Sequence, residues 1–101
     1  MGLYSMRDAA NIIINKEFIH GKYSKEKIFR KVLEIKNIIY YNECRNKYYN
    51  KKWMFNWKII NYYYPEFSDC FEDYYTPKGY YQPMITEIGI EKLKELFYEI
   101  Y

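Results

Sequence analysis

The most informative part of the chain is residues 24–41, which read SKEKIFRKVLEIKNIIYY. Ser24 is a suitable helix N-cap, because its hydroxyl can accept a hydrogen bond from an otherwise unpaired amide in the first turn. At about 100° per residue, the apolar side chains behind it fall on one face of a helix. These side chains are Ile28, Phe29, Val32, Leu33 and Ile35. We therefore predict a helix whose apolar stripe packs into the core.

The opposite arc of this helix is mainly cationic. Its charged residues are Lys27, Arg30, Lys31 and Glu34, and Lys25 lies in the first turn. Residues 38–41 are β-branched and aromatic, which suits a strand. A core helix with a basic outer face, leading into a strand, is what a winged helix-turn-helix has at its recognition element. A solvated surface helix also commonly has a charged outer face, and the sequence leaves both interpretations open.

The elements before this helix complete the order of a helix-turn-helix. Ser5 caps a first helix that reaches about residue 15, and Asp8 occupies the capping-box position three residues further on. The connection over residues 16–23 contains Gly21, which resets the backbone before the next cap. This connection is longer than the usual three or four residues of a helix-turn-helix.

Residues 42–57, NECRNKYYNKKWMFNW, interleave cations with aromatic side chains such as Trp53. The cations are Arg45, Lys47, Lys51 and Lys52. One interpretation is a wing, a hairpin whose cations meet phosphates while an aromatic residue stacks or wedges. The other is an ordinary loop whose aromatic residues cover the core. Residues 58–64 then predict a strand that ends at Pro65.

The segment 65–75 is acidic, and its carboxylates are Glu66, Asp69, Glu72 and Asp73. Phe67 and Phe71 lie between them four residues apart, which fits one or two helical turns or a packed loop. The segment lacks the alternation and central glycine of a calcium loop, so we predict a solvated acidic segment.

The end of the chain predicts a turn, a strand and a helix. The turn covers residues 76–79, and a short strand over residues 80–85 contains Pro83, which places it at a sheet edge. Thr86 then caps the last helix. Its apolar face consists of Ile90, Leu93, Leu96, Phe97 and Ile100. We expect this helix to close the core and to offer a contact for a homodimer.

The length and composition indicate one folded domain over residues 1–101. The predicted elements make it a small α+β domain of the winged helix-turn-helix type, with three or four helices and a short antiparallel sheet or wing. A chain of this size buries roughly 60 to 65% of its unfolded surface. Half of its residues are hydrophobic and 29% are charged, which excludes disorder. No apolar run approaches the roughly 18 residues that span a bilayer, and no secretory signal opens the chain. We expect a soluble, cytoplasmic protein without membrane contact.

Positive charge is concentrated in the first part of the chain. Residues 1–58 contain 13 Lys or Arg against 5 Asp or Glu, whereas residues 59–101 contain 3 against 8. The two parts therefore carry net charges of +8 and −5, which combine to the overall +3. This asymmetry indicates an anionic partner for the first part, of which nucleic acid is the commonest.

The residues that carry chemistry are few. His20 is the only histidine, and Cys44 and Cys70 have no neighbouring cysteine, which is too little for a structural zinc site. No glycine-rich phosphate loop exists among the four glycines, and no third group completes a catalytic motif with His20 and Cys44. We expect two reduced thiols, no cofactor, no metal, no catalytic residue and no enzymatic activity.

Three stretches resemble the C-terminal domain of phage antirepressors of the KilA type. YSMRDAANII at the start is similar to the first helix of that family, with its serine cap and "daA" core. KIFRKVLEIKNIIYYNECRNKY resembles the second helix and the "L-x-x-x-x-I-I-Y" strand entry. MITEIGIEKLKELF resembles the "T-x-x-G-I-x-x-L" helix, here Thr86, Gly89, Ile90 and Leu93. The resemblance implies a stand-alone copy of a small winged-helix-like domain from a phage or prophage, located in the cytoplasm of the bacterial host.

The first functional hypothesis is a transcription regulator that binds double-stranded DNA. The helix after Ser24 would enter the major groove, with Arg30 as the best residue for a base contact because its guanidinium pairs bidentately with guanine. The candidate nucleic-acid-binding residues are Lys22, Lys25, Lys27, Arg30, Lys31, Arg45, Lys47, Lys51 and Lys52.

The alternative hypothesis is an antirepressor or anti-CRISPR-like counter-defence protein. Tyrosine and tryptophan are favoured at protein interfaces, and the chain has 15 tyrosines. Such a protein would inhibit a host or phage nucleic-acid-binding protein by mimicking phosphates. The candidate protein-binding residues are Glu66, Asp69, Glu72 and Asp73.

Overall fold

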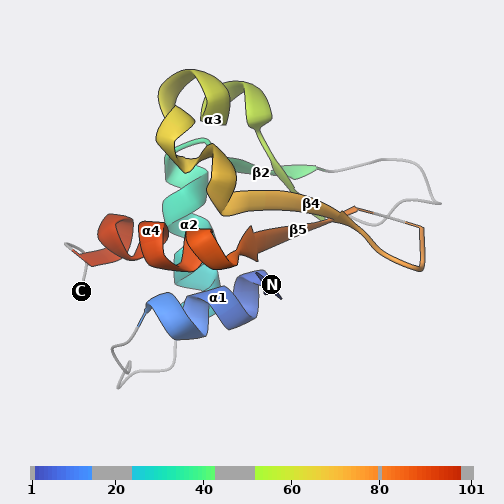
Figure 1. The fold of residues 1–101 in the computed structure, drawn as a ribbon, viewed down its shortest axis with the longest axis horizontal. Coiled ribbons are helices and arrows are strands. Elements are labelled where there is room, and N and C mark those ends of the chain that lie inside the picture. Colours follow the sequence, from blue (N-terminus) through green and yellow to red (C-terminus); the bar gives the residue numbers. More distant parts are fainter. Residues whose placement is uncertain (1, 15–23, 43–51, 80, 99–101) are drawn as a thin grey trace.

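The computed structural model describes residues 2–14, 24–42, 52–79 and 81–98, with Lys52 and Tyr98 described by their backbone alone. These residues form a small α+β domain with short antiparallel sheets, as the sequence predicts, and the arrangement is compatible with a winged-helix-like fold (Figure 1). In chain order the elements are β1 (Leu3–Tyr4), α1 (Met6–Ile13), α2 (Lys25–Ile35), β2 (Ile39–Asn42), β3 (Lys52–Phe55), α3 (Trp57–Tyr63), the 3₁₀ helix η1 (Pro65–Cys70), β4 (Phe71–Tyr75), β5 (Tyr81–Thr86) and α4 (Glu87–Tyr98).

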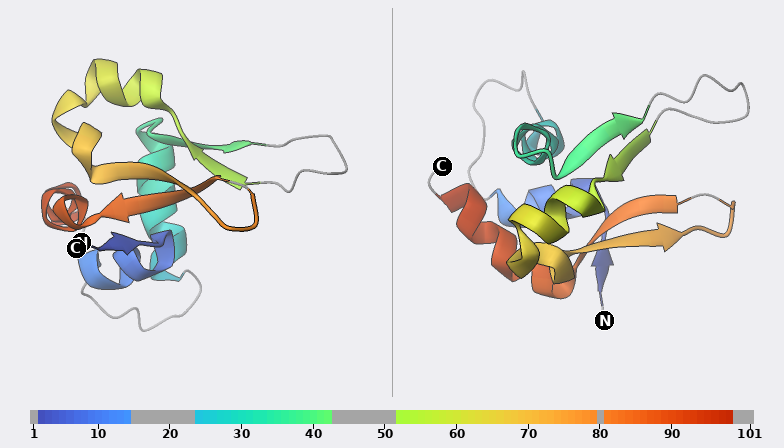
Figure 2. Two further views of the ribbon diagram at one scale, coloured as in Figure 1. Left: turned by 45° about the vertical axis from the view of Figure 1, so that its right-hand side comes forward. Right: turned by 90° about the horizontal axis from the view of Figure 1, so that it is seen from above.

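The strands form two antiparallel sheets. One has the order β1-β5-β4, in which Leu3 pairs with Thr86, and the other is the β2–β3 hairpin. Both hairpins, β2–β3 and β4–β5, extend from the same side of the molecule (Figures 1 and 2). The two sheets meet through Phe55 and Phe71, whose ring centroids lie 4.9 Å apart. Of the predicted wing over residues 42–57, Asn42 and Lys52–Phe55 lie in the paired strands of this hairpin, and residues 43–51 lie outside the described residues. Asn56 and Trp57 belong to the cap and first turn of α3.

The three predicted helix caps are present. The Ser5 hydroxyl accepts from the amide of Asp8 at 3.1 Å, and the Ser24 hydroxyl accepts from the amide of Lys27 at 3.2 Å. The Thr86 hydroxyl accepts from the amide of Gly89 at 3.0 Å. Each bond satisfies an amide that has no partner within its own helix, so these short polar residues define where α1, α2 and α4 begin.

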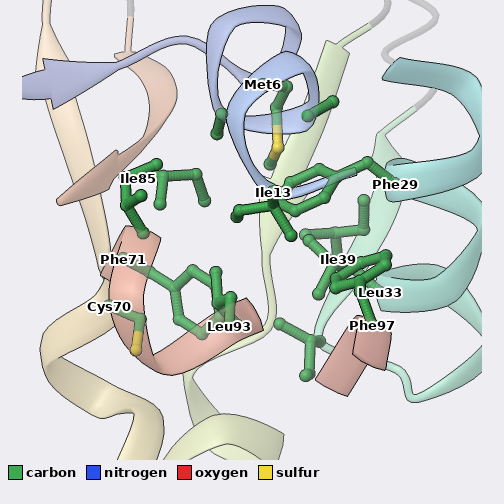
Figure 3. Close-up of a cluster of buried hydrophobic side chains, with 14 of the residues drawn as sticks. Met6, Ile13, Phe29, Leu33, Ile39, Cys70, Phe71, Ile85, Leu93 and Phe97 are labelled. Carbon is green, nitrogen blue, oxygen red and sulfur yellow. The ribbon is translucent and has the colours of Figure 1, made fainter. Parts of the chain in front are cut away.

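The core lies where α1, α2 and α4 meet the two sheets (Figure 3). Phe29 of α2 stacks on Phe97 of α4 at 5.0 Å, and both side chains are buried. From α1, the small Ala9 and Ala10 are fully buried, which allows α1 to pack closely against its neighbours. The predicted stripe of α2 is wrong at one position, because Ile35 in the last turn is 68% exposed.

The predicted strand over residues 58–64 is wrong, because this segment forms helix α3. The Asn56 side chain caps α3 by accepting from the amide of Ile59 at 3.3 Å. Trp57, Ile60 and Tyr64 then fall at helical spacing and pack on the core, with Ile60 fully buried. A short run of isoleucine and tyrosine suits either a strand or a helix, and here the cap and the core contacts select the helix.

The acidic segment and the last strand also differ from their predictions. Residues 65–70 are helical as one alternative had it, but residues 71–75 form strand β4. Strand β5 lies in the centre of its sheet and not at an edge. Pro83 is tolerated there because β1 pairs only with Ile85 and Thr86, so at Pro83 the strand has β4 as its single pairing partner.

Gly89 allows α4 to approach the end of η1. A Cβ atom at this position would lie 2.5 Å from the carbonyl oxygen of Cys70 and 2.9 Å from its Cα. Both are backbone atoms that cannot rotate away. The glycine of the T-x-x-G-I-x-x-L stretch therefore has a packing role: it lets the first turn of α4 lie against η1.

Candidate nucleic-acid interface

The joint between α2 and the β2–β3 hairpin determines where the hairpin lies. Asn37 ends α2 in the left-handed region at φ 62°, which asparagine adopts more readily than most residues. The amides of Asn37 and Ile38 donate to the carbonyls of Glu34 and Leu33, each at 2.9 Å, in the pattern of a Schellman motif. Ile38 and Leu33 are both fully buried, so the turn is fixed from inside. Strand β2 consequently starts at a set angle from the end of α2 (Figure 2).

A hollow of about 590 Å³ lies between the outer side of α2 and the hairpin. The hairpin contributes Trp53, and α2 contributes all the other lining residues. These are Lys27, Ile28, Arg30, Lys31, Val32 and Glu34. The structure thus brings three of the predicted nucleic-acid-binding cations together with an aromatic residue of the wing.

Arg30 lies between α2 and the hairpin, and its guanidinium makes two weak contacts. Its guanidinium carbon lies 5.5 Å from the centre of the Trp53 ring, a cation–π distance. One of its nitrogens lies 3.6 Å from Glu26, which is also 3.7 Å from Arg7 of α1. The Arg30 side chain is 28% exposed, so it remains reachable from solvent. Its two contacts orient the guanidinium without enclosing it.

The neighbouring cations are more exposed. The Lys31 side chain is 68% exposed and lies 3.5 Å from Glu34 on the same helix. Lys27 is exposed and Lys25 is half-buried in the first turn. An exposed ion pair at such a distance contributes about 0 to 1 kcal/mol. A phosphate can therefore replace Glu34 beside Lys31 at little cost to the fold.

The side chains of the remaining predicted cations lie outside the described part of the structure. The backbone of Lys52 lies in β3, paired with Asn42. Lys22, Arg45, Lys47 and Lys51 lie outside the described residues, as do His20 and Cys44. The described part of the predicted interface is therefore its α2 half together with Trp53.

Two of the four acidic residues proposed to contact a protein partner, Asp69 and Asp73, bind side chains of other elements, whereas Glu66 and Glu72 are exposed on η1 and β4. Lys92 of α4 donates to both carboxylate oxygens of Asp69, at 2.8 and 2.9 Å, and to the carbonyl of Glu66 at 3.0 Å. The hydrogen bond from Lys92 lowers the pKa of Asp69 from its ordinary value of 3.8, and the same bond raises the pKa of Lys92. The indole of Trp57 donates to Asp73 at 2.6 Å. Two of these carboxylates thus fix elements of the domain to one another.

Cys70 is a core residue and not a reactive thiol. It is fully buried, and burial raises its pKa to about 12, with the adjacent Asp69 carboxylate acting in the same direction. A thiol with this pKa is protonated at neutral pH and is a poor nucleophile. Among the residues that the structure describes, no group of three or more His, Cys, Asp or Glu is placed to hold a metal ion.

The importance of Glu26 and of the position of Trp53 was not apparent from the sequence. The i, i+4 spacing of Glu26 and Arg30 is a sequence signal for their pairing. The contact between Arg30 and Trp53 has no such signal, since it depends on the angle between α2 and the hairpin.

Comparisons of the chain with protein-family models, with curated proteins and with solved structures gave no match. No helix in the described part of the chain has the length and apolar character needed to cross a membrane. The functional assignment therefore depends on the surface described above and on the three motif stretches.

Proposed function

We propose that the chain is a phage- or prophage-type regulatory protein that binds double-stranded DNA through α2 and the β2–β3 hairpin. The observation that carries this proposal is that Lys27, Arg30 and Lys31 line one hollow together with Trp53 of the hairpin. The exposed side of α2 would face the major groove, where Arg30 pairs with a base edge and the lysines contact phosphates. The role assigned to the chain is binding, with no catalytic step.

The charge distribution supports the same choice. Residues 1–58, which contain α2 and the hairpin, carry a net +8, and an anionic polymer is the partner that such a surface attracts. The alternative, a protein that mimics phosphates with its acidic segment, has less support. Asp69 and Asp73 would have to exchange short internal hydrogen bonds for a partner, whereas Arg30 and Lys31 of α2 lie 3.6 and 3.5 Å from their carboxylates.

The test is a titration of labelled mixed-sequence duplex DNA with the purified protein over a range from about 50 to about 200 mM salt. If about five phosphate contacts form, the slope of log K against log salt is about −4 to −5. The proposal also predicts that selection from a random-sequence pool yields a preferred site. A slope near zero, or no binding at low salt, overturns the proposal.

A further inference from the structure

We infer that the hollow between α2 and Trp53 holds a single unstacked nucleotide of a bound nucleic-acid strand. This inference deepens the proposed function and rests on it, because it names what the chain recognises at this surface. It goes beyond groove binding, since a duplex with all its bases paired presents no free base face to a side chain.

Trp53 supplies the stacking surface. It is half-buried in β3 and forms a T-shaped pair with Tyr41 of β2, with ring centroids 5.0 Å apart. Trp53 lines this hollow and also a second hollow of about 510 Å³ on the side of α1 and β5. The indole is therefore held by Tyr41 and by the Arg30 guanidinium, which lies 5.5 Å from its ring centre, and it borders both hollows. A base would stack on the part of the ring that Arg30 leaves open or on the guanidinium itself. Indole and guanidinium are the planar groups on which unpaired bases stack in nucleic-acid-binding proteins.

The charges distinguish the two hollows. The hollow beside α2 is lined by three cations, Lys27, Arg30 and Lys31, against the single carboxylate of Glu34. The hollow on the side of α1 is lined by Arg7 and Arg30 against Asp8 and Glu26, which gives no net charge. A phosphate is attracted to the first hollow and not to the second. The occupant of the first hollow is consequently an anion with a planar ring.

The size and the apolar walls fit one nucleotide. Ile28 and Val32, four residues apart on α2, are half-buried and face the hollow beside Trp53. They provide an apolar surface for a base or sugar, while the lysines lie on the helix turns that flank them. At about 590 Å³ the hollow is within the usual range of roughly 300 to 1,000 Å³ for small-molecule sites, which is room for one nucleotide.

The required chemistry, a base next to a phosphate, has two sources: an unpaired nucleotide in a strand or a free mononucleotide. The net charge of +8 on residues 1–58 exceeds what one nucleotide phosphate balances, which favours a strand with further phosphates beside the unstacked base. An acidic, aromatic peptide is a different partner and is an outcome of the test.

The test uses Trp53 as its own reporter. Trp57 is changed to Phe, which leaves Trp53 as the single tryptophan, and fluorescence is excited where tyrosine does not absorb. The full chain is titrated with a mixed-sequence duplex, with the same duplex carrying one unpaired nucleotide, and with a free mononucleotide. We expect Trp53 to be quenched by the duplex with the unpaired nucleotide, which also binds about 5-fold or more tightly than the paired duplex.

Matched variants separate the effect of stacking on Trp53 from an effect on folding. Trp53→Leu removes the affinity difference between the two duplexes, whereas Trp53→Phe retains part of it and Trp57→Phe leaves it unchanged. A cooperative thermal transition shows that each variant is folded. If Trp53→Leu does not fold, the quenching of Trp53 in the Trp57→Phe protein still decides the question.

The outcomes distinguish this inference from the proposed function. Equal binding of both duplexes without quenching overturns the inference and leaves duplex binding intact. Quenching by the mononucleotide without binding of either duplex supports the nucleotide site with the free source and overturns the proposed DNA function. Failure of all three probes overturns both, and quenching by an acidic aromatic peptide alone replaces the nucleotide with a protein partner.

Discussion

Helices α2 and α4 meet inside the core, where Phe29 of the first stacks on Phe97 of the second, yet their outer faces are held very differently. On α2, Glu26 pairs with Arg30 and with Arg7 of α1, and Lys31 pairs with Glu34, at 3.5 to 3.7 Å. On α4, Lys92 reaches η1 and makes three bonds of 3.0 Å or less. The first turn of α4 also touches the backbone of Cys70 at Gly89.

The contrast separates charges that maintain the fold from charges that a ligand can use. When a ligand replaces a short bond between two elements, such as that of Lys92 to Asp69, the fold loses a tertiary contact. An ion pair at 3.5 Å or more within one helix contributes little stability, so its replacement by a ligand costs the fold little. By this criterion α2 has the surface on which we propose binding, and the charges of α4 hold the fold together. The comparison can be tested by changing one helix at a time.

The largest expected effect is that of Gly89→Ala in α4. The new Cβ would lie 2.5 Å from a backbone carbonyl, so α4 and η1 must move apart. We expect a loss of about 1 to 3 kcal/mol in the free energy of unfolding, measured by denaturant titration. The matched change on α2, Lys31→Ala, alters stability by no more than about 0.5 kcal/mol. Equal stability of Gly89→Ala and the unchanged protein would show that α4 is not closely packed there.

Charge reversal on α2 should affect binding and not folding. In Lys27→Glu with Lys31→Glu, the loss of two phosphate contacts reduces the salt slope of DNA binding by about 2. Affinity at low salt falls by about tenfold or more. The control is Lys78→Glu with Lys94→Glu, which has the same net charge but changes residues outside α2. If both double variants lose affinity equally, overall charge and not the α2 surface determines binding.

Removal of the Lys92 charge on α4 should lower the stability of the fold and leave DNA binding unchanged, which is the reverse of the pattern for α2. Lys92→Gln loses the bonds to Asp69 and to the carbonyl of Glu66, so its melting temperature falls below that of Lys94→Gln, whose Lys94 pairs with Glu91 on the same helix. DNA affinity stays the same in both variants. A stronger effect of Lys92→Gln on DNA binding than on stability would contradict the division between the helices.

The smallest effect concerns the pH dependence of stability. Lys92 lowers the pKa of Asp69 from 3.8 in the folded chain, so this group stabilises the fold above that pH. The contribution is lost as the pH falls through the lower folded value. Thermal unfolding from neutral pH to below 3.8 should therefore show a steeper loss in the unchanged protein than in Asp69→Asn. Parallel profiles for the two proteins would rule out the assigned role of Asp69.

Elements set by local chemistry were predictable, and those set by tertiary contacts were not. The caps at Ser5, Ser24 and Thr86 identify three helices, because each cap and its helix are adjacent in sequence. Residues 57–63 are too few for their periodicity to separate a helix from a strand. Strand β4 is exposed on both faces beyond Phe71, so it has no alternation to detect.

The candidate site also has one part that local sequence predicts and another part that depends on tertiary contacts. The basic arc of α2 follows from helical periodicity, which requires only the sequence of one helix. The position of Trp53 against Arg30 requires the turn at Asn37 and the register of the β2–β3 hairpin. The partners of Asp69 and Asp73 come from elements distant in sequence, which no local pattern reveals.

The pairing of Leu3 with Thr86 has a consequence for how the domain is made on the ribosome. Helices α1 and α2 emerge first, but Ile85 and Phe97, which cover their apolar faces, belong to the last strand and helix. Closing so long a loop costs entropy that is recovered only when those residues arrive. The nascent chain therefore exposes the apolar stripes of α1 and α2 until synthesis has passed α4, and an interrupted product leaves them uncovered.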